Sequence, residues 1–238
     1  VTSGNWITKK NGGSGASTTG SPQTINYTAA ANPSSSVRSG KITVRAGDPS
    51  AGPTGDIVLN QLGATLSVSG ATTVAATAST DNTSTFTATP GLSWNVGIVS
   101  TDNWLSLKST ASGTNNTPVA AQNITYDAVV NPDESTRTGS ITVKVGNAVS
   151  GTDAGLTKTI TVTQEASSLT VSINPTAALA ATKDVTGTFT MNGTKGLAYS
   201  FTAGFPAWLT VTNNTATTNG GTTTGANQQL TYKTASVN

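Results

Sequence analysis

Apolar and polar residues alternate along much of the chain, most clearly in its middle. Ile141, Val143 and Val145 are separated by single polar residues, and Ile160 and Val162 by a threonine. A period of two residues is typical of a strand with one buried face. Turns rich in Gly, Asn and Ser separate seven such runs. The predicted strands are 64–69, 84–89, 92–100, 103–108, 122–130, 138–145 and 156–164.

No window shows a helical period of 3.6 residues with capping residues, so the pattern predicts an all-β protein. The pattern also recurs. Residues 38–44 read RSGKITV and residues 137–143 read RTGSITV, and Trp104-Leu105 recurs as Trp208-Leu209. The repeat is roughly 100 residues long, the size of an immunoglobulin-like sandwich rather than of a solenoid unit. We therefore predict tandem immunoglobulin-like β-sandwiches.

Only the middle repeat is complete. We expect residues 1–62 to form the second half of a repeat, residues 63–166 a complete repeat and residues 167–238 the first half of another. Half a sandwich cannot bury its inner face. Either the chain is a window on a longer protein, or strands of another chain complete the half-repeats. Both halves contain the segment from the Trp strand to the Tyr strand, and this overlap favours the window.

The amino-acid composition excludes several kinds of functional site. Charged residues make up 9% of the chain, and there is no Cys and no His. Thiolate and imidazole metal sites, Cys nucleophiles, Ser-His relays and disulfides are therefore excluded. The only adjacent acidic pair, Asp133-Glu134, follows a proline in a turn, and no calcium-loop or phosphate-loop motif occurs. We expect no enzyme, no catalytic residue, no cofactor and no metal.

Charge and hydropathy also bear on the partners. The net charge is +2, and the basic residues are spread along the chain, so we expect no nucleic-acid partner. No apolar run approaches the length of a membrane span, so we expect no membrane insertion.

The repeats resemble BACON domains, modules associated with Bacteroidota. The resemblance rests on a Trp strand, an Asn-x5-Arg-x-Gly-x-Ile-x-Val segment and a closing strand that ends in Gln. These features fall at Trp6, Trp104 and Trp208, at 32–44 and 131–143, and at 57–61 and 162–164. The family implies an immunoglobulin-like fold and was first proposed to bind carbohydrate. Its members occur in surface glycoside hydrolases, large surface proteins and phages of gut Bacteroidota, often as spacers.

Recurring side chains have two interpretations each. Ten of the twelve aromatic residues recur between repeats, and we interpret them as core residues rather than sugar-stacking platforms. Phe201 and Phe205 have no counterpart. Arg38 and Arg137 could bind an anion, but recurrence favours a role in fixing a neighbouring loop. Gln61 and Gln164 lie on the inward side, where we expect them to bond backbone near the next repeat.

The loops after the Trp strands, residues 9–22, 109–121 and 212–227, differ most between repeats. Variable polar loops on a rigid sandwich are where a binding site would lie, although we favour the simpler interpretation that they are solvated spacer loops. Four charged residues on predicted strands could protect sheet edges from aggregation. They are Lys41, Arg45, Lys144 and Lys158.

These observations favour a structural module, a stalk or scaffold of a larger extracellular or virion surface protein. Its expected partners are other domains of the same longer chain or neighbouring copies. Linkers of two or three residues would hold the repeats as a semi-rigid rod. The alternative is a carbohydrate-binding or adhesion module that uses the variable loops, with a glycan as partner. A third hypothesis is assembly by strand exchange at residues 1–62 or 168–238. The expected location is the surface of a Bacteroidota bacterium or the virion of its phage.

Overall fold

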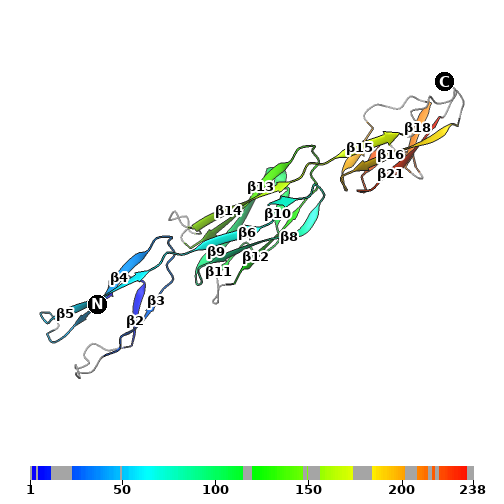
Figure 1. The fold of residues 1–238 in the computed structure, drawn as a ribbon. Coiled ribbons are helices and arrows are strands. Elements are labelled where there is room, and N and C mark those ends of the chain that lie inside the picture. Colours follow the sequence, from blue (N-terminus) through cyan, green and yellow to red (C-terminus); the bar gives the residue numbers. More distant parts are fainter. Residues whose placement is uncertain are drawn as a thin grey trace.

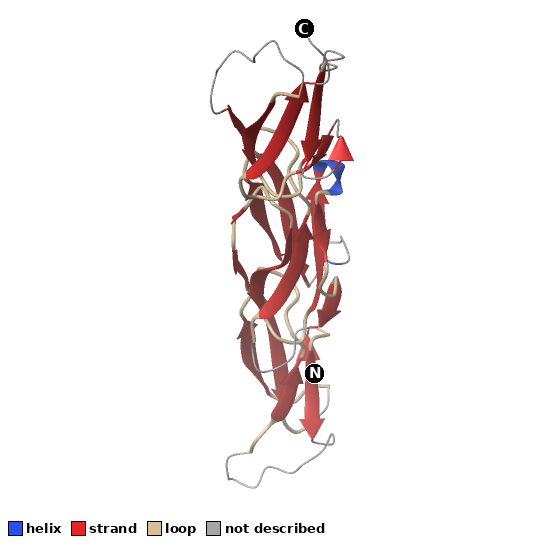
Figure 2. Cartoon of the chain, turned by 90° about the vertical axis from the view of Figure 1, so that its right-hand side faces the viewer, coloured by secondary structure: helices blue, strands red, loops and turns tan. Residues whose placement is uncertain are grey.

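The computed structural model consists of β-sheets arranged in three successive units (Figure 1). It describes residues 2–3, 5–11, 23–48, 50–114, 120–146, 149, 156–173, 184–201, 208–213, 216–217 and 220–234. The units follow one another along one axis, and a perpendicular view shows the same elongated outline (Figure 2). The all-β class predicted from the alternation of apolar and polar residues is confirmed.

The middle unit consists of two sheets. One has the strand order β10-β12-β8-β6, and the other has the order β11-β9-β13-β14-β7. All pairs are antiparallel except β14 and β7, which are parallel. The strands are β6 (Leu66–Gly70), β7 (Thr73–Val74), β8 (Ser79–Ala88), β9 (Ser93–Ser100), β10 (Leu105–Leu107), β11 (Ser112–Thr114), β12 (Gln122–Ala128), β13 (Arg137–Val145) and β14 (Leu156–Gln164). A 3-10 turn, Thr101–Asn103, joins β9 to β10.

Each of the seven predicted strands overlaps an observed one, and the prediction missed β7 and β11. The largest boundary error is in β8, which begins five residues before the predicted strand. Its early part contains Asp81 with a positive φ of 58°. The Asp127 carboxylate accepts a hydrogen bond from the Asp81 N–H at 2.8 Å. This irregularity breaks the alternation, so the sequence pattern begins only after it.

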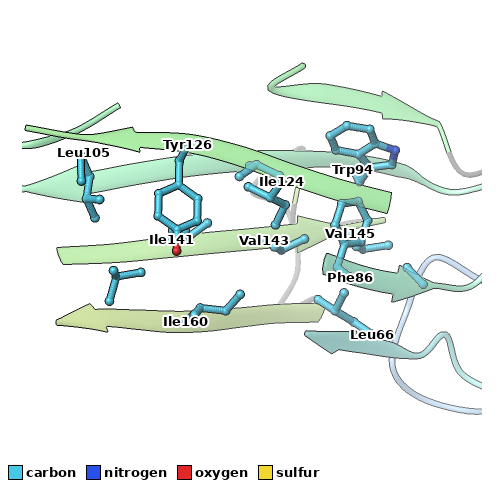
Figure 3. Close-up of a cluster of buried hydrophobic side chains, with 14 of the residues drawn as sticks. Leu66, Phe86, Trp94, Leu105, Ile124, Tyr126, Ile141, Val143, Val145 and Ile160 are labelled. Atoms are coloured by element: carbon cyan, nitrogen blue, oxygen red, sulfur yellow. The ribbon is translucent and has the colours of Figure 1, made fainter. Parts of the chain in front are cut away.

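The inward side chains of both sheets form one hydrophobic core in the middle unit (Figure 3). Ile124, Ile141, Val143 and Val145 are fully buried. Phe86 packs edge-on against Trp94, with ring centroids 5.1 Å apart. The alternation along β12, β13 and β14 places every second side chain in this core, which is why the sequence revealed these strands.

The first unit has two small sheets, β1-β4-β5 and β2-β3. Its strands are β1 (Thr2–Ser3), β2 (Ile7–Asn11), β3 (Asn26–Ala29), β4 (Arg38–Arg45) and β5 (Thr54–Gln61). The β4–β5 hairpin repeats the pairing of β13 with β14: Arg38 lies opposite Gln61, as Arg137 lies opposite Gln164.

The third unit has the sheets β15-β16-β21-β18-β19 and β17-β20. The order of β15, β16, β21 and β18 repeats that of β6, β8, β12 and β10. The strands are β15 (Leu169–Ile173), β16 (Thr186–Gly193), β17 (Ala198–Ser200), β18 (Leu209–Asn213), β19 (Ala216–Thr217), β20 (Gly220–Thr222) and β21 (Gln228–Thr234).

The inner face of the first unit is open. Tyr27 is 45% exposed, and Val44 and Ile57 are each 43% exposed, whereas their counterparts in the middle unit are buried. Among the described residues, no strands of the first unit take the places that β6 and β8 fill in the middle unit. The same inner side chains are thus buried where two complete sheets face each other and exposed where strands of the second sheet are missing.

Candidate functional site at the repeat junctions

The recurring aromatic residues of the middle unit are in the core. Trp104 is 1% exposed, and Phe86, Trp94 and Tyr126 are also buried. The core interpretation is therefore confirmed for the complete repeat, which leaves no exposed stacking platform at these positions. Trp6 and Trp208, in the incomplete repeats, are partly buried.

The two phenylalanines without a counterpart can be placed only in part. Phe201 packs edge-on against Phe189 and Tyr199, with ring centroids 6.2 and 5.9 Å apart. It therefore belongs to the hydrophobic cluster of the third unit. Phe205 lies outside the described residues.

Arg137 connects a tryptophan, a glutamine and the end of β12. Its guanidinium carbon lies 5.0 Å from the centroid of the Trp104 ring, a cation–π arrangement. Its Nε donates a hydrogen bond to Gln164 Oε1 at 2.7 Å. One Nη donates to the carbonyls of Val129 and Val130 at 3.0 and 2.8 Å. We refer to Trp104, Arg137, Gln164 and these two carbonyls as the arginine clamp.

The first unit contains the same clamp. Arg38 lies 4.5 Å from the centroid of the Trp6 ring and donates to Gln61 Oε1 at 2.8 Å. Its Nη donates to the carbonyls of Ala30 and Ala31 at 2.7 and 3.0 Å. Desolvation by the surrounding protein lowers the pKa of both arginines from its usual value. Nε and one Nη of each arginine thus donate to the protein itself, and the loop-fixing interpretation of Arg38 and Arg137 is confirmed.

The closing glutamines bind backbone, as their inward position predicted. Gln164 is fully buried, and its Nε2 donates to the carbonyls of Val129 at 2.8 Å and Ala75 at 3.0 Å. Gln61 Nε2 donates to the carbonyl of Ala30 at 2.9 Å. The glutamine therefore links the end of its own strand to the segment that follows the Tyr strand.

A buried asparagine holds the exit of each of the first two units, a role that the sequence analysis missed. Asn131 Nδ2 donates to the carbonyls of Ser135 and Glu165, both at 2.8 Å. Asn32 Nδ2 donates to the carbonyls of Ser36 at 2.8 Å and Leu62 at 3.0 Å. Because both asparagines precede a proline, the pattern suggested only a turn. Their recurrence was the signal that could have revealed the contact.

The first residues of the following repeat bind the same turn. The Ala64 N–H donates to the carbonyl of Ser34 at 2.8 Å, and the Ser167 N–H donates to the carbonyl of Asp133 at 2.8 Å. The Ser167 hydroxyl also donates to the carbonyl of Asn131. Two successive junctions are thus built with one hydrogen-bond pattern.

Side chains also meet across the first junction. Ala31 packs against the core of the middle unit. Gly146 has a φ of +64°, and a Cβ at this position would lie 2.5 Å from the carbonyl oxygen of Pro33. Such a distance is below van der Waals contact, so only glycine fits between the two units here.

The loop after each Trp strand is partly a strand. In the middle unit β11 pairs with β9, and Gly113 lies opposite Trp94. A Cβ at Gly113 would lie 2.7 Å from the indole ring. In the third unit β20 pairs with β17, and Gly221 lies opposite Tyr199 in the same way. The described parts of the second and third variable loops therefore cover an aromatic side chain rather than presenting one, and residues 12–22 of the first loop lie outside the described residues.

The four charged residues expected to protect sheet edges lie in different environments. Lys41 forms an ion pair with Asp56 at 2.7 Å, and Arg45 donates to the carbonyls of Ser50 and Gly52. Lys144 is on β13, which has a neighbour on each side. Lys158 is on β14, whose outer edge is largely unpaired. Their effect on aggregation remains a prediction.

The described residues contain no group of three or more acidic side chains that could hold a metal ion. In that same part of the chain, no helix has the length and apolar character needed to cross a membrane.

The sheets and junctions define a class of repeat protein whose β-sheet units are joined by hydrogen bonds between the end of one unit and the start of the next. The BACON family model, described as a "putative binding domain, N-terminal", matches residues 2–62 and 94–165. The chain belongs to the BACON family, as the resemblance of its motifs predicted. Each matched segment contains one arginine clamp and one buried junction asparagine.

No curated protein matches the chain. Fifteen chains of solved structures match it. One is a protein of unknown function from Porphyromonas gingivalis W83, with 11% sequence identity and a TM-score of 0.29. That match covers 71% of this chain and 83% of the other.

Proposed function

We propose that this chain is a scaffold or stalk module of a larger surface protein, and that its repeats hold other domains at a fixed spacing. The observation that carries the proposal is the repetition of the junction. At both junctions a buried asparagine donates to the carbonyl of the residue that follows the closing strand, and one of the first residues of the following repeat donates to the turn after that asparagine. Hydrogen bonds that cross from one unit to the next limit rotation at a two- or three-residue linker.

The proposal extends to location and partners. The chain would belong to the surface of a Bacteroidota bacterium or to the virion of its phage, with neighbouring domains of the same protein as its partners. Membership of a family described as a binding domain rather than an enzyme supports a non-catalytic role. The low content of charged residues supports it as well, because catalysis by acids and bases needs titratable side chains.

Small-angle X-ray scattering of the Asn131→Ala variant tests the scaffold. The substitution removes the hydrogen bond to the carbonyl of Glu165, just after β14, and the hydrogen bond to the carbonyl of Ser135 in the turn before β13. We expect a broader distribution of interatomic distances and a shorter mean extension, because the third unit can then rotate. The exposed Asn123 on β12 offers a matched control, since Asn123→Ala leaves the junction intact. Far-UV circular dichroism distinguishes a loosened junction from an unfolded repeat, and identical scattering from both folded variants would contradict the proposal.

Glycan binding by the variable loops is the second candidate function, and the description of the family as a binding domain favours it. A glycan array probed with the whole chain tests it. Binding that disappears when residues 109–114 are replaced by a Gly-Ser segment would place recognition on the loop. Binding that survives replacement of all three loops, residues 9–22, 109–121 and 212–227, would exclude the loops as the site.

A further inference from the structure

The outer edge of β14 is free over most of its length. β14 has nine residues, and all of them pair with β13. On the other side, β7 pairs only with Thr163 and Gln164. Among the described strands no other is hydrogen-bonded to this edge. Residues 156–162 therefore form the open edge of a five-stranded sheet.

The orientation of the backbone groups follows from the pairing with β7. The Thr163 N–H donates to the carbonyl of Thr72 at 2.7 Å, and the Glu165 N–H donates to the carbonyl of Val74 at 3.0 Å. Because backbone groups alternate in direction along a strand, those of Thr157, Thr159 and Thr161 point the same way. The backbone N–H and C=O groups of these three threonines therefore lie in line with the groups of β14 that already bind β7.

A groove of about 520 Å³ follows this edge. Its walls are β14 on one sheet and β6 on the other; β6 is an edge strand, and β14 is paired with the short edge strand β7 at only two of its residues. Val68 and Ile160 supply apolar surface, and the remaining lining side chains are threonine and serine hydroxyls and one glycine. The lining contains no charged and no aromatic side chain, so it offers little to an ion or to a stacking ligand.

Lys158 gives the edge its selectivity. It lies on the same side of β14 as Ile160 and Val162, yet it is exposed and belongs to none of the ion pairs among the described residues. A charged side chain on the inward side of an edge strand opposes indiscriminate pairing with apolar strands. A strand that places a carboxylate opposite Lys158 would remove this penalty.

We propose that the β14 edge binds an extended peptide segment of a partner protein by strand addition. The segment continues the interface with β7, places small uncharged side chains over Val68 and Ile160, and presents a carboxylate to Lys158. Main-chain hydrogen bonds to Thr157, Thr159 and Thr161 supply the affinity, and the charge pair supplies the selectivity. This recognition goes beyond the scaffold role and does not depend on it.

The test uses two synthetic peptides and the whole chain labelled with ¹⁵N. The first peptide is acetyl-Thr-Val-Thr-Glu-Thr-Val-Thr-amide, whose sequence reads the same in both directions, so it suits parallel and antiparallel pairing. The second carries Lys at its centre. N-methylation at alternate residues leaves one edge able to pair and prevents the peptides from aggregating. We expect the Glu peptide to shift the amide signals of β14 and to bind about fivefold more tightly than the Lys peptide.

Variants separate strand addition from adventitious contact. Lys158→Glu should reverse the preference between the peptides. Thr159→Pro removes an outward N–H that β13 does not use and should abolish binding, whereas Thr159→Val keeps the N–H and should retain it. Unchanged amide signals elsewhere show that each variant is folded. The proposal is overturned if neither peptide shifts β14 up to about 1 mM, or if Lys158→Glu leaves the preference unchanged.

Discussion

Replacing Arg137 with alanine removes the centre of the arginine clamp. The variant loses three hydrogen bonds, to Gln164 Oε1 and to the carbonyls of Val129 and Val130, and the contact with the Trp104 ring. The Gln164 side chain is fully buried, so its oxygen is left without this donor in a place where water does not replace it easily.

The cost can be estimated from these losses. A hydrogen bond from a charged group contributes about 1.5–3 kcal/mol, and a buried acceptor left unpaired costs about 1–3 kcal/mol. The cation–π contact contributes about 0.5–2 kcal/mol. These contributions are not additive, because they all come from one side chain. Each is also reduced because Arg137 is only partly buried. We therefore expect Arg137→Ala to lower the free energy of unfolding of the middle unit by about 3–5 kcal/mol.

Native-state hydrogen exchange measures this loss locally, through the amides of β12, β13 and β14. The matched control is Lys144→Ala on the same strand, an exposed side chain whose removal should change stability by at most about 0.5 kcal/mol. If Arg137→Ala costs less than about 1 kcal/mol, the clamp is not a stabilising element and the structural interpretation of the recurring arginine is refuted.

Three further predictions concern the middle unit. Gly113→Val should displace β11 from Trp94, because the added side chain meets the indole, and the tryptophan fluorescence emission should shift to longer wavelength. The control Ser112→Val, at an exposed position, should leave the emission wavelength unchanged. Burial raises the pKa of the Tyr126 hydroxyl, so its contribution to stability is full below about pH 10 and is lost as the pH rises through the folded-state value. Absorbance at about 295 nm should show a late phenolate titration that Tyr126→Phe removes; an unchanged titration curve in that variant would contradict this assignment. Gly146→Ala should loosen the first junction, seen as faster exchange of the Ala64 amide, since the new Cβ meets Pro33 and the backbone has a positive φ; unchanged exchange would contradict the close contact.

The sequence predicted those parts of the fold that leave a periodic trace. Val143 and Ile160 alternate with polar residues because one face of their strands is buried, so β13 and β14 were found with small boundary errors. β7 has two residues and β11 has three, too few to show a period of two. Short strands of this kind are specified by tertiary pairing, which a local pattern does not contain.

The candidate site was predictable in its residues but not in its contacts. Recurrence singled out Arg38 and Arg137, and the inward side predicted the backbone bonds of Gln164. The acceptors of Arg137 are main-chain carbonyls seven and eight residues away, and no side-chain pattern marks them. Asn131 reaches Glu165 across 34 residues, a contact that depends on where the folded chain leaves the sandwich.

In the proposed scaffold, the hydrogen bonds at the two junctions fix the repeats relative to one another. The chain has no cysteine, so two introduced cysteines can carry spin labels without interference. Val58 and Val99 are 64% and 72% exposed and lie in the first and middle units, and the exposed Lys195 lies in the third. Double electron–electron resonance should give one narrow distance distribution for the pair at 58 and 99 and another for the pair at 99 and 195. Broad distributions for both pairs would mean that the repeats rotate freely, and the scaffold account would be wrong.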